Sequence, residues 1–210
     1  MSVVPFPTMK RPLVAILRGV KPEEAEGIVS VLIEAGMTAI EIPLNSPDPF
    51  RSIGMAVKLA PAEVLVGAGT VLTTDDVDRL HDVGGKLLVA PNVDTEVLAR
   101  AAAHGMVTMP GVFTPTEALL AARAGASSLK FFPASVLGAA GIAAIRAVLP
   151  DGPMIAAVGG VSDANFAEYI KGGVRAFGLG SSLYKPGMTA ADVAVRASAT
   201  IKAYDLAVQG

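Results

Sequence analysis

The sequence predicts an α/β protein with a single-domain (β/α)8 TIM barrel over residues 1–210. Short apolar runs alternate with amphipathic stretches along the chain, and together they form eight pairs. The runs are apolar throughout, as expected of parallel strands that are covered by helices. The chain is a little shorter than the ~250 residues typical of this barrel. An open, doubly wound parallel sheet is the structural alternative.

The expected strands are the short apolar runs, each followed by turn residues. They lie at Leu13–Leu17, Ala39–Leu44, Val64–Ala68, Leu87–Ala90, Val107–Met109, Ser128–Phe132, Met154–Val158 and Ala176–Leu179. The expected helices are the amphipathic stretches that follow these runs. They lie at residues 22–35, 48–59, 74–83, 94–104, 115–124, 138–148, 163–171 and 190–207. Start signals support three of them, because Pro22, Thr74 and Ser162 are each followed by acidic side chains.

The composition excludes several classes of protein. The chain is 52% hydrophobic and 17% charged, and its net charge of −2 gives no basic surplus for nucleic acid or an anionic membrane. No stretch without Asp, Glu, Lys or Arg, Phe131 to Ile145 included, reaches the ~20 residues of a membrane span. The first residues lack the apolar core of a secretory signal, so we expect a cytoplasmic protein. There is no cysteine, and His81 and His104 are the only histidines, so we expect no disulfide and no metal site.

The charged residues within or just after strands are the candidates for chemistry. In a barrel of this kind, active sites form at the carboxyl ends of the strands. Arg18, Glu41 and Lys130 all fall at that end and would converge on one face of the barrel. Glu63, Lys86 and Arg175 instead precede their strands, and solvation or surface ion pairs explain them.

Lys130 lies late in an apolar strand, in the run Ser-Ser-Leu-Lys-Phe-Phe-Pro. Burial disfavours the ammonium form, so the free amine is available to form a Schiff base with a ketone. Glu41 is expected to point inward, because strand alternation turns Ile40 and Ile42 toward the helices. A buried carboxylate there suits a general acid or base. A structural ion pair with Lys130 or Arg18 is the alternative for Glu41, and a paired or solvent-reaching ammonium is the alternative for Lys130.

Anion-binding groups are expected at the same end of the barrel. Arg18 has the two-pronged donor geometry that suits a carboxylate, Gly19 would allow a ligand to approach closely, and Thr70 could add a hydroxyl. Glycine-rich turns follow the seventh and eighth strands, at Gly159-Gly160 and Gly180-Ser181. Loops at these two places often bind phosphate through backbone N–H groups. Ordinary tight turns are the alternative explanation for these glycines. For Gly67 and Gly69, which precede Thr70, the alternative explanation is close strand packing.

The order and spacing of these motifs resemble a known family, the class I pyruvate aldolases that cleave 2-keto-3-deoxy-6-phospho-sugar acids. The resemblance runs from about Leu13 to Val208. It rests on Glu41, Gly67-Ala68-Gly69-Thr70-Val71-Leu72, Pro110-Gly111, Lys130-Phe131-Phe132-Pro133, Gly159-Gly160 and Gly180-Ser181. It implies a Schiff base on Lys130, proton transfer by Glu41, no cofactor, no metal and a homotrimer. Pyruvate and a phosphorylated keto-deoxy sugar acid would be the small-molecule partners.

Two positions distinguish the branches of this family, and this sequence departs from the phosphogluconate pattern at both. The phosphogluconate branch usually has an arginine four residues after the glutamate and a threonine before the glycine pair. Asn45 and Val158 occupy those places here, and the arginine is Arg18. This pattern is similar to the phosphogalactonate branch, so we expect cleavage to pyruvate and D-glyceraldehyde 3-phosphate in galactonate breakdown, with Val158 selecting the configuration at C4. A phosphogluconate or dual-epimer aldolase is the nearer alternative; a non-catalytic sugar-phosphate-binding barrel, or a barrel isomerase or synthase, is more distant.

Overall fold

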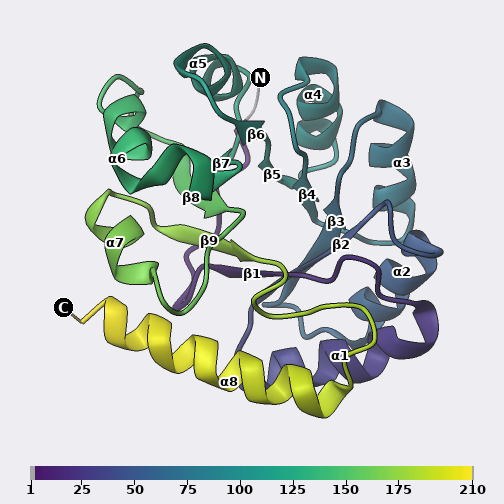
Figure 1. Ribbon diagram of the computed structural model, residues 1–210. Coiled ribbons are helices and arrows are strands. Elements are labelled where there is room, and N and C mark those ends of the chain that lie inside the picture. The colour runs from purple at the N-terminus through teal and green to yellow at the C-terminus, as the bar shows by residue number, and fades with distance from the viewer. Residues whose placement is uncertain (1–2, 210) are drawn as a thin grey trace.

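The computed structural model describes residues 3–209 and shows a barrel of parallel strands surrounded by helices (Figure 1). Within these residues the sheet has nine strands in the order β5-β4-β3-β2-β1-β9-β8-β7-β6. Every strand pairing in it is parallel. The predicted (β/α)8 barrel is therefore confirmed, and the open doubly wound sheet is not what forms.

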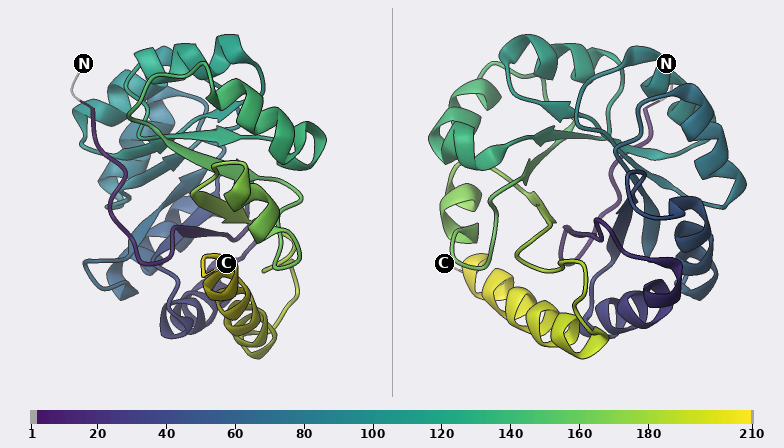
Figure 2. Two further views of the ribbon diagram at one scale, coloured as in Figure 1. Left: turned by 90° about the vertical axis from the view of Figure 1, so that its left-hand side faces the viewer. Right: turned by 45° about the vertical axis from the view of Figure 1, so that its right-hand side comes forward.

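The strands lie close to their expected positions. They are β1 (Leu13–Ile16), β2 (Ala39–Pro43), β3 (Leu65–Gly69), β4 (Leu87–Val89), β5 (Val107–Met109), β6 (Gly111–Val112), β7 (Ser128–Phe131), β8 (Met154–Val158) and β9 (Ala176–Leu179). Helices follow them around the outside of the barrel (Figure 2). They are α1 (Pro22–Ala35), α2 (Pro49–Leu59), α3 (Thr74–Asp82), α4 (Thr95–Ala103), α5 (Pro115–Arg123), α6 (Ala134–Arg146), α7 (Phe166–Lys171) and α8 (Ala190–Ala207).

The fifth strand of the barrel is divided at Pro110, which the sequence did not predict. Proline has no N–H to donate, so the ladder is interrupted there. Strand β5 pairs with β4, whereas β6 pairs with β7, and the Pro110 carbonyl accepts a hydrogen bond from the Lys130 N–H at 3.0 Å. Thr108 and Ser127 bridge the remaining gap, because each backbone N–H donates to the other's hydroxyl, at 2.9 and 3.1 Å. Together β5 and β6 occupy one place, which leaves eight places in the barrel.

Two helices start three or more residues away from their expected positions. Helix α6 begins at Ala134 rather than at residue 138, and Gly138 inside it has a non-helical φ of 71°, so the segment bends there. Helix α7 begins at Phe166 rather than at residue 163. The preceding residues form a turn instead, because the Ser162 N–H donates to the Asn165 side chain at 2.9 Å.

The core has an outer layer and an inner layer. Ile40 and Ile42 pack outward under the helices, as predicted, whereas Ala39 belongs to the inner cluster. The half-buried side chains of Val4, Phe6 and Met9 pack against this inner cluster. Figure 2 shows their N-terminal segment running along the side of the barrel at which the strands begin. Among the helices that the structure describes, none is both long and apolar enough to cross a membrane.

Candidate active site

Glu41 and Lys130 both lie toward the carboxyl ends of strands of the barrel. Glu41 lies on β2 beside Ile16 of β1, and Lys130 lies on β7 beside Gly111 of β6. Their side chains are almost fully buried, with exposed fractions of 3% and 6%. Neither side chain therefore reaches out to bulk water, so the solvent-reaching ammonium that the sequence left open for Lys130 is not what forms.

Burial shifts the pKa values of both groups toward neutral pH. It lowers the pKa of the Lys130 amine to about 8, although the charge of Glu41 acts in the opposite direction and Arg18 adds to the lowering. It raises the pKa of Glu41 to about 7, against the charges of Lys130 and Arg18. A lysine so shifted is partly a free amine at physiological pH, and the carboxyl group can exchange protons there. Perturbed values of this kind are frequent in functional sites.

The two groups are neighbours but not an ion pair. Within residues 3–209, no nitrogen of Lys130 or Arg18 lies within 4.0 Å of a Glu41 oxygen. Glu41 Oε2 has no hydrogen-bond partner in the structure. Lys130 Nζ lies 5.0 Å from the centroid of the Phe132 ring. The geometry thus differs from the structural ion pair that the sequence left open.

The glycines of β3 make room for Glu41 and for strand packing. A β-carbon on Gly69 would overlap Glu41 Oε2, and one on Gly67 would overlap the Leu87 carbonyl. Thr70, directly after Gly69, has a left-handed φ of 58°, which is rare for a threonine. Close packing was the alternative explanation for these glycines, and it applies to Gly67. At Gly69 the close neighbour is the carboxylate of the candidate site itself.

Arg18 is held on the rim of the barrel by the loop after β2. Its Nη1 donates to Asn45 Oδ1 at 2.7 Å, and the Gly19 N–H donates to Ser46 Oγ at 2.9 Å. A β-carbon on Gly19 would lie 2.8 Å from Pro186 Cγ, so the loop after β9 approaches closely here. Gly19 also lines a cavity of about 350 Å³ together with Arg18, Gly180 and Ser181.

A cavity of about 360 Å³ opens between the loops after β1, β7, β8 and β9. It brings together the predicted residues Arg18, Val158, Gly159, Gly160, Gly180 and Ser181. Its lining also includes residues that the sequence did not single out, namely Ile16, Phe132, Val161, Ser162, Gly178 and Ser182. Lys130, Glu41 and Thr70 are not in its lining, although the Phe132 ring, which is, has its centroid 5.0 Å from Lys130 Nζ.

The loops after β8 and β9 are joined at the cavity. Ser182 Oγ donates to the Val161 carbonyl at 3.0 Å, which ties one glycine-rich turn to the other. Gly159 and Gly160 have φ values of 90° and 78°, where other residues are strained. A β-carbon on Gly160 would overlap the Ser135 side chain, so this position has no room for one either. The glycine pair is thus required by the shape of the turn.

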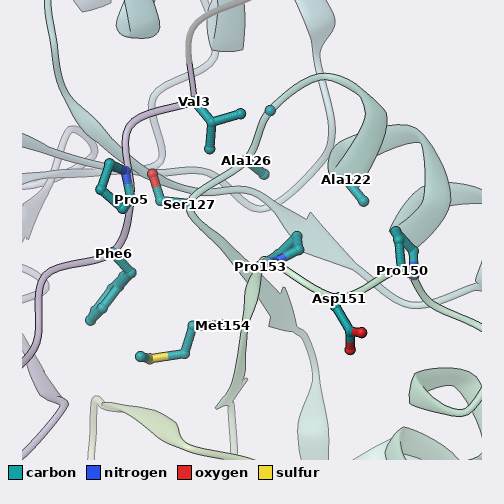
Figure 3. A pocket seen from close by; sticks show the side chains of 12 residues that line it. Val3, Pro5, Phe6, Ala122, Ala126, Ser127, Pro150, Asp151, Pro153 and Met154 are labelled. Carbon is teal, nitrogen blue, oxygen red and sulfur yellow. The ribbon is translucent and has the colours of Figure 1, made fainter.

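A larger cavity lies at the opposite end of the barrel, where β7 and β8 begin. This cavity has a volume of about 500 Å³. Its lining combines residues of the N-terminal segment with Ser127 and Met154 (Figure 3). Apart from Asp151 and Ser127, the side chains labelled there are apolar. Strand starts carry structural rather than catalytic residues in this fold. The chemistry of the molecule therefore points to the carboxyl end.

The two histidines lie together outside the candidate site. His104 Nε2 lies 2.8 Å from Asp78 Oδ1, and the His104 ring stacks on His81 at 4.0 Å between centroids. Asp78 and His81 belong to α3 and His104 directly follows α4, away from the carboxyl ends of the strands. Across residues 3–209 no group of three or more histidine or acidic side chains could hold a metal ion.

A buried lysine with a partly free amine, at the mouth of a barrel, is typical of enzymes that work through a Schiff base. The comparisons with known proteins agree on one such class. A family model described as KDPG and KHG aldolase matches residues 7–205. The chain belongs to this family of class I aldolases, which are carbon–carbon lyases.

Three relatives are closely similar over nearly their whole length. A protein of Rhizobium meliloti (strain 1021) described as "Probable 2-dehydro-3-deoxy-6-phosphogalactonate aldolase" is 70% identical over 100% of this chain and 99% of its own. The 2-dehydro-3-deoxy-6-phosphogalactonate aldolase of Escherichia coli (strain K12) is 47% identical over 95% of this chain and 98% of its own. A solved structure described as "Native KDPGal structure" has a TM-score of 0.94 at 46% identity, and the match covers 97% of this chain and 98% of that one.

Proposed function

We propose that the chain cleaves 2-dehydro-3-deoxy-6-phospho-D-galactonate to pyruvate and D-glyceraldehyde 3-phosphate, a step in galactonate breakdown. The observation that carries the chemistry is Lys130, a buried amine at the carboxyl end of β7 whose pKa burial lowers to about 8. The identity of the substrate is supported by the two relatives described as phosphogalactonate aldolases. The reaction needs neither a cofactor nor a metal, because the lysine supplies the electron sink.

Lys130 is the nucleophile. Its free amine attacks the C2 ketone to give a carbinolamine, which loses water to form an iminium ion. The electrons of the C3–C4 bond then flow toward the iminium nitrogen, and an enamine of pyruvate forms as the bond breaks. Protonation of C3 and hydrolysis release pyruvate and restore the amine. Lys130 Nζ lies more than 4.0 Å from the Glu41 oxygens, so the amine is not held in an ion pair with this carboxylate.

Glu41 moves the protons. It accepts the proton of the C4 hydroxyl during cleavage, directly or through a water, and the leaving fragment becomes an aldehyde. It also shuttles protons in the formation and breakdown of the carbinolamine. A carboxyl pKa of about 7, raised by burial, suits both directions of transfer near neutral pH.

The two ends of the substrate bind to different groups. Arg18 and Thr70 hold the carboxylate, and the N–H groups of Gly159, Gly160 and Gly180, with Ser181, hold the phosphate. In support, the phosphate-binding residues and Arg18 line one cavity of about 360 Å³. Arg18 is exposed and its guanidinium has one donor engaged by Asn45, so its other donors are available to an anion.

Val158 selects the configuration at C4. It ends β8, lines the cavity and is almost fully buried. A threonine there would present a hydroxyl to the C4 hydroxyl of one epimer, whereas valine offers only methyl groups. An aldolase that accepts the phosphogluconate epimer as well is the second candidate function, favoured by the family model, whose description covers KDPG and KHG aldolases.

The assembly and location are proposed by analogy with the family. We propose a homotrimer in the cytoplasm that binds neither nucleic acid nor membrane, and a single catalytic domain. Large apolar side chains are available for subunit contacts beside the carboxyl ends of β6 and β7, since Phe113 and Val136 have exposed fractions of 37% and 72%.

The decisive experiment has two arms. Borohydride reduction in the presence of pyruvate will trap pyruvate on the peptide that carries Lys130, and Lys130→Met will abolish trapping while the exposed-site variant Lys58→Met does not. Retro-aldol assays of both C4 epimers, side by side, will show higher kcat/KM for the phosphogalactonate. Trapping on any other peptide would sink the assignment of Lys130. Ligand binding without trapping would favour a non-catalytic barrel, an isomerase or a synthase.

A further inference from the structure

We infer that Asn165 is a positioning residue for the phosphate site, and that its side-chain amide aims the Val161 N–H at the substrate phosphate. Asn165 lies outside the lining of the cavity, at the residue before α7. The inference rests on the proposed phosphate site and adds to it a backbone donor and the side chain that orients this donor.

The contacts of Asn165 span the whole turn after β8. Its Nδ2 donates to the Gly160 carbonyl at 2.9 Å, and its Oδ1 accepts from the Ser162 N–H at 2.9 Å. Its own backbone N–H donates to the Ser162 carbonyl at 3.2 Å. One side chain therefore holds the turn on both sides of Val161.

Hydrogen bonds to the carbonyl groups of the turn fix the direction of the N–H group that follows each carbonyl. In a trans peptide the C=O and the next N–H face opposite directions. The Gly160 carbonyl is held by Asn165, so the Val161 N–H faces away from Asn165. The Gly159 carbonyl accepts from the Ser135 N–H at 2.9 Å, which orients the Gly160 N–H in the same manner.

These two N–H groups are free for a ligand. Within the part of the chain that the structure describes, neither the Gly160 nor the Val161 N–H donates a hydrogen bond to the protein. Both residues line the 360 Å³ cavity. Consecutive free N–H groups on a turn of this kind form a concave site for an anion.

The backbone of this turn needs a side chain to hold it in place, because the turn contains two glycines in succession. Glycine populates many backbone conformations, so Gly159 and Gly160 do not by themselves fix the peptide plane that follows them. The Gly159 carbonyl is already held by Ser135, and the Val161 carbonyl by Ser182. Asn165 is the side chain that holds the plane between them, and this plane carries the Val161 N–H.

The neighbouring Asp163 allows a test at constant charge. Asn165→Asp keeps the acceptor for Ser162 but loses the donor to the Gly160 carbonyl, and it adds a negative charge near a phosphate. Combining it with Asp163→Asn restores the charge of the turn. Asp163 is exposed and its side chain makes no hydrogen bond within residues 3–209, so Asp163→Asn alone is the matched control.

The assay is the condensation of pyruvate with D-glyceraldehyde 3-phosphate, compared with phosphate-free D-glyceraldehyde. In the double variant we expect KM for the phosphorylated aldehyde to rise roughly tenfold, the effect of one hydrogen bond to a charged group. KM for D-glyceraldehyde and the rate of pyruvate trapping on Lys130 will match those of Asp163→Asn. Should the double variant not fold, Asn165→Ala tests the same contacts in the same assays.

The outcomes separate this inference from the proposed function. An unchanged KM for the phosphorylated aldehyde, or an equal rise for both aldehydes, overturns the role of Asn165 while the phosphate site stands. A wild-type enzyme that shows no preference for the phosphorylated aldehyde overturns the phosphate site, and the role of Asn165 with it.

Discussion

Glu41 Oε2 lies against Gly69, in the space that a β-carbon at that position would fill. The oxygen is buried and has no hydrogen-bond partner within the structure. The backbone of β3 therefore sets where the carboxylate of β2 can sit, and it does so by the absence of a side chain.

Gly69→Ala will displace the Glu41 carboxylate and lower kcat by about 100-fold or more, the contribution expected of a well-placed general acid or base. Pyruvate binding to the folded variant will change less than kcat. Gly27→Ala is the control, because a β-carbon on Gly27 in α1 meets only the Ala190 Cβ at 3.8 Å. Steady-state kinetics with a thermal melt for each variant make the measurement. Full activity in a folded Gly69→Ala would contradict the proposed part of Glu41.

The pH dependence of Schiff-base formation follows from the two buried groups. The Lys130 amine must be unprotonated to attack, and burial lowers its pKa to about 8, so pyruvate trapping at short times will rise with pH up to about that value. The charge of Glu41 raises the Lys130 pKa against this burial. Glu41→Gln removes that charge, so the midpoint of the trapping profile will move to lower pH, even though the plateau rate falls. A midpoint that stays in place or moves upward would show that Glu41 does not act on the Lys130 charge.

Val158→Thr will change the preference between the C4 epimers. The added hydroxyl gives one epimer a hydrogen bond worth about 1 kcal/mol, so the ratio of the two kcat/KM values will shift by roughly fivefold toward the phosphogluconate. The two retro-aldol assays measure this ratio directly. The same substitution at Val195, which is 72% exposed on α8, will leave it unchanged. An unchanged ratio in Val158→Thr would remove Val158 from the account of specificity.

Chelation will not lower the activity. The iminium on Lys130 withdraws the electrons of the C3–C4 bond, so the proposed reaction has no step that requires a metal ion. Activity after dialysis against EDTA, compared with activity after added Mg²⁺ or Zn²⁺, will be the same within error. Abolition by EDTA with recovery on adding metal would instead indicate a metal-dependent aldolase.

The barrel and the convergence of its charged residues could be predicted because both depend on local patterns in the sequence. Buried parallel strands must be apolar, so a charge late in such a strand is visible at once, as at Glu41 and Lys130. The rule that the carboxyl ends of strands carry the site then sorted these charges from Glu63, Lys86 and Arg175.

Other features depend on three-dimensional partners and were missed. The division of the fifth strand follows from Pro110, but the pairing of its halves with β4 and β7 is set by barrel closure. Asn165 acts through bonds to the backbone of Gly160 and Ser162, which leave no pattern in the sequence. The question of an ion pair between Glu41 and Lys130 is one of distance, and only coordinates answer it.

The N-terminal segment packs Val4, Phe6 and Met9 against the inner cluster. These three residues belong to no helix or strand, yet they cover apolar side chains at the end of the barrel where the strands begin. Deletion of residues 3–10 would expose that cluster to water, so the expected consequence is a lower free energy of unfolding. The stability of the barrel thus depends in part on a segment at the end opposite the candidate active site.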